Sequence, residues 1–384
     1  MFGIEKEEWA ELGGIYTATE IRQQPRLWNE TYEIIKNNKN EINDFLFNNI
    51  KSNTRVILTG AGTSDYVGDS IYLYLSKKLG LRVEAIATTD LVSNPYEIIE
   101  EDTPTILVSF ARSGNSPESV GAYDILNENI KDIAQIVITC NKNGELAKKS
   151  IGGKTLSLIM PEESNDKSFA MTSSFSSMML AALLVFDIDN LEGNKKIVDI
   201  IVSNADKILE NNWTDIKDIV GYGCTRVVYL GSGALKGLAQ EMALKNLELT
   251  SGKIITVCES VLGFRHGPKS IIDDETLVII MNSVNDYTNL YDMDLIREIS
   301  GDAGSHKLCV VSYRKNEEIR SLVDKYIEVD GIEIPEVYTI FNYMLFGQIF
   351  GLFSALKSCI SPDNPRPDGT VNRVVKGVAI HRFN

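Results

Sequence analysis

The sequence has no CxxC cysteine pair, and its five cysteines, an odd number, are widely separated along 384 residues. Neither a disulfide framework nor a zinc site fits that spacing, so we expect a reducing, cytoplasmic environment. Basic residues are also scarce: 38 lysines and arginines against 53 aspartates and glutamates leave a formal net charge of −15. A surface of that sign repels phosphate backbones, which excludes nucleic acid as an expected partner. A local pocket can still bind a small anion.

An apolar leader is missing as well, because the N-terminal residues MFGIEKEEWAELGG are acidic, so we expect no secretory signal. Two uncharged stretches, 168–186 and 337–356, reach the length of a membrane span. The first carries five serines and a threonine, the second contains Asn342, Gln348 and two glycines, and neither is flanked by a basic cluster. We therefore expect buried helices of a soluble protein and no membrane partner.

Short β-branched runs that alternate with amphipathic segments are the most frequent pattern in the chain. Five such runs lie between residues 55 and 160, and four more follow between residues 226 and 313. Apolar strands that alternate with helices predict a parallel sheet with helices on both faces. The loop GAG at 60–62 recurs 171 positions later as GSG at 231–233. We therefore predict an α/β protein with two tandem, doubly wound, three-layer units.

The repeat and the segments before, between and after its two copies divide the chain into five predicted parts. A helical lead-in (1–50) precedes the first unit (51–190), a helical linker (191–222) follows, and the second unit (223–360) and a tail (361–384) complete the chain. Pro365 and Pro367 of the tail reduce the entropy that is lost when it becomes ordered, so we expect it to dock and close a site.

Small hydroxyl residues gather in three segments of the first unit: GAGTS (60–64), ARSGNS (111–116) and MTSS (171–174). In an open α/β sheet, ligands bind beyond the carboxyl ends of the strands, where loops lead into helix N-termini. Hydroxyls, backbone amides and helix dipoles at one edge are the components of a phosphate site. The corresponding segment of the second unit, MNSVNDYT, lacks the set. We predict one phosphate site per chain, in the first unit.

Single residues of these segments also allow other interpretations. Asp65 stands where a dinucleotide-binding fingerprint requires its third glycine, which disfavours a nicotinamide cofactor. Ser116 followed by Pro117 is also the pattern of a helix N-cap with proline at the first helical position, and such a cap needs no ligand. The convergence of three Ser/Thr segments is harder to explain by capping alone.

Acid–base candidates are few, because the chain has only three histidines. His266 lies in the tight loop GFRHGP. On one predicted helix, Glu241, Lys245 and Glu248 share a face, although a solvated Glu–Lys pair is the simpler alternative. The tail holds a single lysine, Lys376. It is a candidate functional residue, and an ordinary surface lysine is the simpler interpretation. No group of residues has metal-ligand spacing, so we expect no metal.

Six segments in this order resemble the sugar isomerase (SIS) domain family: GAGTS, SFARSGNS, AMTSSF, EMALKNLEL, GFRHGP and NRVVKG. They are similar to segments of the isomerase half of glucosamine-6-phosphate synthase. Two longer segments, SFARSGNSPES and NPRPDGTVNRVVKG, are closer to tagatose-6-phosphate ketose/aldose isomerases, a group also described as galactosamine-6-phosphate deaminases. The resemblance covers nearly the whole chain and implies two tandem SIS domains.

The resemblance implies a sugar 6-phosphate as substrate, without a cofactor. It implies that the sugar phosphate is bound by residues of the three segments, namely Gly62, Thr63, Ser64, Arg112, Ser113, Ser116, Thr172 and Ser173. It also implies that Glu248 is the base at the carbon skeleton, that His266 serves ring opening and that Lys376 is a Schiff-base lysine. Glu241 and Lys245 match polar helix positions of the synthase and are candidates for supporting roles.

Two positions depart from the synthase pattern. Arg112 stands in place of a glutamine, so we expect different contacts to the phosphate or the sugar. Met171 stands in place of a serine, so Thr172 or Ser173 would have to supply that contact.

A source of ammonia is also missing from the sequence. The synthase obtains nitrogen from an N-terminal glutaminase domain with a cysteine nucleophile, whereas this chain has no cysteine before Cys140. We therefore expect an amino-sugar 6-phosphate, such as galactosamine 6-phosphate, to be converted into a ketose 6-phosphate, such as tagatose 6-phosphate, and ammonia. The alternatives are aldose–ketose isomerisation of a hexose 6-phosphate and a non-catalytic sugar-phosphate-binding regulator. The resemblance also implies a homodimer or larger homo-oligomer.

Overall fold

The computed structural model describes residues 1–149, 154–329, 331, 334–375 and 377–383. The chain forms two compact units, which we name after the sheet that each contains. The first-sheet unit consists of Arg26–Asp166, Met171–Val198 and Asp368–Asn384. The second-sheet unit consists of Met1–Pro25, Lys167–Ala170 and Asp199–Pro367.

The first-sheet unit contains a parallel sheet of five strands in the order β2-β1-β3-β4-β5. Its strands are β1 (Arg55–Thr59), β2 (Arg82–Ala85), β3 (Thr105–Ala111), β4 (Ile133–Thr139) and β5 (Thr155–Ile159). Every residue of β1, β3 and β4 is buried, because a parallel strand between two helical layers has no solvent-facing side. Each fully buried Val, Ile or Leu side chain stabilises the fold by about 1.5–3 kcal/mol.

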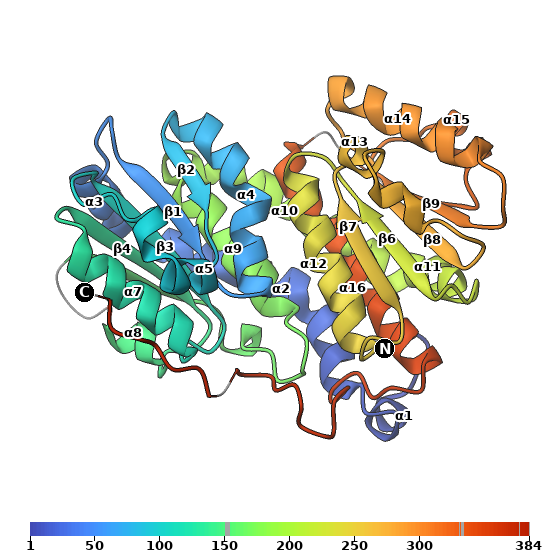
Figure 1. Ribbon diagram of the computed structural model, residues 1–384, viewed down its shortest axis with the longest axis horizontal. Coiled ribbons are helices and arrows are strands. Elements are labelled where there is room, and N and C mark those ends of the chain that lie inside the picture. The colour runs from blue at the N-terminus through green and yellow to red at the C-terminus, as the bar shows by residue number, and fades with distance from the viewer. Residues whose placement is uncertain (150–153, 330, 332–333, 376, 384) are drawn as a thin grey trace. The chain divides into compact units, whose positions relative to one another are not determined.

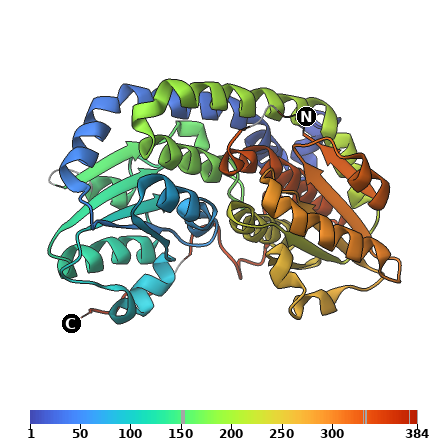
Figure 2. The ribbon, with the colours of Figure 1, turned by 90° about the horizontal axis from the view of Figure 1, so that it is seen from above.

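Helices cover both faces of this sheet (Figures 1 and 2). On one face α4 (Thr63–Leu79) packs with α9 (Ser173–Val185), and on the other α5 (Thr88–Ser93) packs with α7 (Pro117–Asn129). The unit also contains α3 (Lys39–Asn49), α6 (Pro95–Ile98) and α8 (Glu145–Lys149). Two helices, α2 (Ile15–Asn37) and α10 (Leu191–Lys207), each contain residues of both units.

The second-sheet unit repeats this topology with the strand order β10-β9-β8-β6-β7. Its strands are β6 (Arg226–Leu230), β7 (Ile255–Glu259), β8 (Thr276–Met281), β9 (Lys307–Ser312) and β10 (Lys325–Glu328). Its helices are α1 (Lys6–Glu11), α11 (Trp213–Val220), α12 (Ala234–Leu249), α13 (Val261–Phe264), α14 (Asp286–Gly301), α15 (Glu317–Leu322) and α16 (Glu336–Lys357). In both sheets the second strand lies at one edge beside the first, so the predicted α/β class with two parallel sheets is confirmed.

The two uncharged stretches form helices of the core. All residues of α9 are buried, and α16 is buried from Val337 to Ala355. By length and composition, α16 passes as a membrane span, and 94% of that segment is buried inside the structure. Two of its buried amide side chains form hydrogen bonds within the core: Asn342 donates to the Ile201 carbonyl at 2.9 Å, and Gln348 accepts from Gln24 at 2.7 Å.

Candidate active site

A cavity of about 110 Å³ lies at the carboxyl ends of β1 and β3 in the first-sheet unit. Parts of the three predicted segments and of the C-terminal tail line it: Ala61, Ser64, Phe110, Ala111, Arg112, Ser113, Gly114, Ser116, Ser119, Met171, Arg373, Val374 and Val375. This lining contains two arginines and no carboxylate. In a chain with a net charge of −15, such a local reversal of sign favours a small anion.

The loop after β1 is shaped by its glycines. A Cβ on Gly60 would lie 2.3 Å from the carbonyl carbon of Ser64, so only glycine fits there. Gly62 has φ +56°, a conformation that favours glycine. The turn places Thr63 and Ser64 at the start of α4, both buried, and Ser64 reaches the cavity.

The start of α4 contributes its dipole and a hydroxyl rather than a row of free amides. The amide of Ser64 donates to Ala61 at 3.2 Å, and that of Asp65 donates to Gly62 at 2.9 Å. The 17-residue helix still places the positive end of its dipole at the cavity. Burial, together with the charges of Asp69 and Asp90, raises the pKa of Asp65 to about 7, so near neutral pH a large fraction of Asp65 carries no charge.

The loop after β3 brings a guanidinium and a hydroxyl to the cavity. Arg112 is 6% exposed, and its Nη2 donates to the carbonyl of Arg373 at 2.8 Å, which ties the C-terminal tail to this loop. The Ser113 carbonyl accepts from the Asn141 side chain at 2.8 Å, which fixes the loop against the segment after β4. Arg112 and Ser113 both line the cavity.

Ser116 is the N-cap of α7, as the capping interpretation predicts. Its Oγ accepts from the Ser119 amide at 3.4 Å and donates to the Ser119 hydroxyl at 2.6 Å. Both serines line the cavity. Because the Ser116 proton points to Ser119, the Ser119 hydroxyl is left to donate to a ligand, so capping and ligand binding are compatible.

The start of α9 is occupied by a carboxylate of the protein itself. Asp166 accepts from the amides of Thr172, Ser173 and Ser174 at 2.9, 3.0 and 2.9 Å. Thr172 and Ser173 are fully buried and do not line the cavity, which Met171 reaches instead. The structure therefore does not bring these two predicted phosphate ligands to the cavity, because Asp166 already binds the amide donors at the helix N-terminus.

Glu241, Lys245 and Glu248 form a buried charge cluster on α12 of the second-sheet unit. The side chains of Glu241 and Lys245 are each 1% exposed, whereas that of Glu248 is 26% exposed. The Lys245 ammonium lies 3.7 Å from Glu241 and donates a short hydrogen bond to Glu248. Charges at this depth must be paired, so the solvated-face alternative does not describe this helix. Glu248 is the member of the cluster that solvent reaches.

His266 lies at the surface of the second-sheet unit, after α13. Ser260 caps α13 by accepting from the Gly263 amide at 3.1 Å, and the His266 amide donates to the Gly263 carbonyl at 3.0 Å. Gly267 then turns the chain with φ +122°. The His266 side chain is exposed.

Lys376 lies outside the described residues. The residues just before it, Arg373, Val374 and Val375, line the cavity of the first-sheet unit. The tail therefore passes over the loops that carry Arg112 and Ser113.

Comparisons with known proteins identify the family to which the chain belongs. Residues 49–187 match the SIS domain. Over 371 residues the chain is 39% identical to the D-galactosamine-6-phosphate deaminase AgaS of Escherichia coli, covering 96% of each chain. The chain belongs to the AgaS family of SIS-domain proteins.

Solved structures of related proteins match this AgaS-family chain over nearly its whole length. A Clostridium novyi protein assigned as a tagatose-6-phosphate ketose/aldose isomerase is 44% identical, with a TM-score of 0.97 over 100% of this chain and 99% of that one. The tagatose-6-phosphate ketose/aldose isomerase of Escherichia coli is 36% identical, with a TM-score of 0.87 over 96% and 97%. The C-terminal domain of glucosamine-fructose-6-phosphate aminotransferase from Francisella tularensis shares the fold, with a TM-score of 0.72 at 16% identity over 89% of this chain and 96% of that one.

In this AgaS-family chain seven of the predicted residues fall into two groups. One is the cavity, with Ser64, Arg112, Ser113 and Ser116. The other is the cluster of Glu241, Lys245 and Glu248.

Sequence reasoning missed two residues that shape the cavity and its surroundings. Ser119 lies three positions after an N-cap, and that capping-box spacing could have indicated it. Asp166 lies six residues before Thr172, outside any local capping pattern, so no local signal points to it.

A guanidinium, hydroxyls and a helix dipole around one cavity can bind a phosphate monoester, and a partly exposed carboxylate beside an ammonium can transfer a proton.

Proposed function

We propose that this chain is a galactosamine-6-phosphate deaminase that forms a ketose 6-phosphate and ammonia. The observation that carries the proposal is its 39% identity to the D-galactosamine-6-phosphate deaminase AgaS over 96% of both chains. The cavity and the charge cluster supply groups of the kind that this reaction needs: an anion site and a base.

The phosphate group is proposed to bind in the cavity of the first-sheet unit. Arg112 supplies charge-assisted hydrogen bonds, and Ser64, Ser113 and Ser119 supply hydroxyl donors. A volume of about 110 Å³ corresponds to about four water molecules at liquid density. The phosphate group therefore fills the cavity, and the sugar carbons extend out of it. Binding the remote phosphate holds the reacting carbons in place for proton transfer.

Glu248 is proposed to move the proton between C2 and C1. In the open-chain aldehyde the carbonyl at C1 acidifies the proton on C2, and Glu248 removes it and returns it to C1. This transfer leaves an imine at C2, and hydrolysis of the imine gives the ketose and ammonia. One amino-sugar phosphate and one water thus give one ketose phosphate and one ammonia. Lys245 holds the Glu248 carboxylate in position through their hydrogen bond.

His266 and Lys376 are assigned the roles that the resemblance implies. His266 assists ring opening, and Lys376 displaces ammonia from the imine by forming its own imine with the ketose, which water then hydrolyses to release the ketose and the free lysine. Borohydride reduction in the presence of a ketose 6-phosphate tests the second role, because it should fix the sugar to Lys376. Mass spectrometry that finds no adduct would leave hydrolysis of the imine to water.

Aldose–ketose isomerisation is the second candidate function. It is favoured by the solved Escherichia coli relative, 36% identical, which is described as a tagatose-6-phosphate ketose/aldose isomerase. Both reactions share the proton transfer from C2 to C1, so Glu248 serves either of them. They differ in whether nitrogen leaves. Initial rates of ammonia release from galactosamine 6-phosphate, compared with ketose formation from galactose 6-phosphate, separate the two.

We also propose that the protein is a cytoplasmic homodimer or larger homo-oligomer. Four apolar residues of the tail, Val371, Val375, Val378 and Ile380, are between 38% and 53% exposed, more than a free surface favours. The exposed His266 is available to a neighbouring subunit. The five free thiols are compatible with a reducing compartment.

A further inference from the structure

The second-sheet unit retains the loop geometry of the phosphate-binding unit. Gly233, after β6, has φ +59° and ψ −126°, and Gly62, after β1, has φ +56° and ψ −126°. A Cβ on Gly231 would lie 2.5 Å from the Leu235 carbonyl oxygen, just as one on Gly60 would collide with the backbone of the following helix. The two loops therefore have the same backbone, although their sequences differ.

The loop after the third strand is retained as well. Ser283 follows the end of β8 by two residues, as Ser113 follows the end of β3. Asn285 then caps α14, as Ser116 caps α7. The second-sheet unit therefore has the two loops that frame the cavity in the first-sheet unit.

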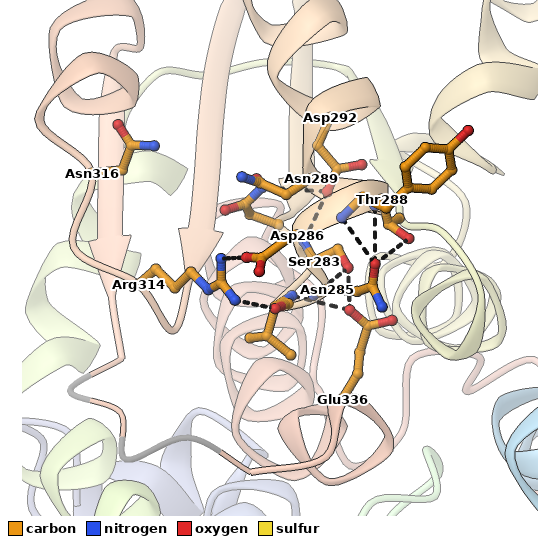
Figure 3. A network of polar contacts seen from close by, with 12 residues as sticks. Ser283, Asn285, Asp286, Thr288, Asn289, Asp292, Arg314, Asn316 and Glu336 are labelled. Atoms are coloured by element: carbon orange, nitrogen blue, oxygen red, sulfur yellow. Dashed lines mark hydrogen bonds and ion pairs between the residues drawn. The ribbon is translucent and has the colours of Figure 1, made fainter.

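The carboxylate of Glu336 lies beside Ser283 in the second of these loops (Figure 3). The Ser283 hydroxyl donates a short hydrogen bond to Oε2 of Glu336, and the Val284 amide donates to the same oxygen at 3.0 Å. The other oxygen, Oε1, lies 3.7 Å from the position that a Cβ on Gly233 would take. Glu336 thus occupies the place that corresponds to the cavity of the first-sheet unit.

The start of α16 places the Glu336 carboxylate beside Ser283. Glu336 is the first residue of α16, which follows the fifth strand of its sheet as α9 does in the other unit. In the first-sheet unit the first residue of α9 is the buried Ser173, and Met171, two residues earlier, lies at the edge of an open cavity. The second-sheet unit instead places an anion at the start of the corresponding helix.

A second carboxylate binds the remaining donor of the loop. Asp292 is fully buried and accepts from the Ser283 amide at 2.8 Å. Burial and the charge of Glu336 raise the pKa of Asp292 to about 6. The hydroxyl and both amides of the Ser283–Val284 turn are therefore saturated by anions of the chain itself.

We propose that Glu336 is a built-in ligand of a second, degenerate phosphate site and keeps that site closed to phosphate monoesters. The proposal goes beyond the deaminase function, because it concerns the unit that we expect to bind no substrate phosphate. It explains why two copies of one fold provide a single site for a sugar phosphate. Removing the carboxylate should expose a hydroxyl and an amide that bind a free anion.

Inorganic phosphate is the probe of this proposal, and equilibrium dialysis of the full chain counts the phosphate bound. Glu336→Ala should bind one phosphate more per chain than the unmodified protein, with a dissociation constant of about 1 mM. Glu336→Gln keeps an oxygen that accepts the same two hydrogen bonds, so it should gain no site. The matched control is Glu317→Ala, because Glu317 is also the first residue of a helix but is 67% exposed.

The difference between variants, rather than the absolute count, is the readout. If the first-sheet cavity is no phosphate site, both counts fall by one and the difference remains, so the two proposals fail separately. An equal count in Glu336→Ala and the unmodified protein would overturn the inference. So would an extra site that persists when Ser283→Ala is added to Glu336→Ala.

Folding provides a second measurement, in case Glu336→Ala is too unstable for dialysis. Without its internal anion the variant should melt at a lower temperature in chloride buffer. Phosphate at about ten times its dissociation constant should then raise the melting temperature by about 3 °C more than it does for Glu336→Gln. An equal rise in both variants would contradict the proposal.

Discussion

Replacing Lys245 by methionine tests the charge balance of α12, because the side chain keeps its length and loses its charge. Lys245 and Glu241 are each 1% exposed, and Glu248 is 26% exposed. In the variant Glu241 becomes a buried carboxylate without the ammonium 3.7 Å away. Glu248 loses the hydrogen bond that positions it.

The expected loss of stability follows from that burial. Removing one partner of a buried ion pair costs about 3–5 kcal/mol, because an uncompensated charge remains. Solvent screens part of the charge of Glu248, so we expect the lower end, about 3 kcal/mol. For a unit of about 150–250 residues this corresponds to a fall in melting temperature of about 6–12 °C. Adding Glu241→Gln to Lys245→Met should recover about half of the loss, because it removes the buried carboxylate that Lys245 no longer neutralises.

Urea unfolding of the four proteins of this double-mutant cycle measures the coupling between the two residues. The matched control is Lys236→Met on the same helix, where Lys236 is 48% exposed and pairs with Glu259 at 3.0 Å. Because an exposed pair contributes about 0–1 kcal/mol, this control should lose no more than that. A Lys245→Met protein as stable as the control, or losses that simply add in the double variant, would refute the reasoning.

Three further predictions concern binding, pH and assembly. Ser113→Ala combined with Ser116→Ala should raise KM for the sugar phosphate about tenfold with little change in kcat; an unchanged KM would leave Ser116 as a helix cap alone. Asp65→Asn should be more stable than the unmodified protein by about 2 kcal/mol near pH 8 and equally stable near pH 4. The reason is that the folded state raises the pKa of Asp65 to about 7, so the unmodified protein loses stability as the pH rises through this window and the buried carboxyl ionises. A difference independent of pH in urea unfolding would contradict that. Sedimentation should give the mass of a homodimer or a larger homo-oligomer. A monomer that is fully active would contradict this prediction.

The fold was accessible to sequence reasoning because its signals are local and repeated. Strands buried on both faces must be apolar throughout, so runs such as 55–59 and 105–111 are visible without any partner. The loop GAG at 60–62 and its copy at 231–233 mark turns that only glycine can make, and they recur with the same backbone. Such signals survive in a single sequence.

The parts of the site that sequence reasoning missed depend on contacts between distant segments. Asp166 binds the start of α9 from outside any capping pattern, so Thr172 and Ser173 look available in the sequence and are buried in the structure. Glu336 appears as an ordinary acidic residue at the start of a helix, and only the folded chain shows that it accepts hydrogen bonds from the Ser283–Val284 turn. Lys245 has the spacing of a surface ion pair, and its burial comes from the packing of α16 against α12.

Ammonia release from galactosamine 6-phosphate, by the unmodified protein and by Glu248→Gln, is the measurement that tests the central claim most directly. We expect one ammonia per sugar phosphate consumed, and a kcat at least about a hundredfold lower in Glu248→Gln with sugar-phosphate binding retained. Ketose formation without ammonia would favour the isomerase instead. Absence of turnover with both amino-sugar and neutral hexose 6-phosphates, or near-normal turnover by a folded Glu248→Gln protein, would contradict the account.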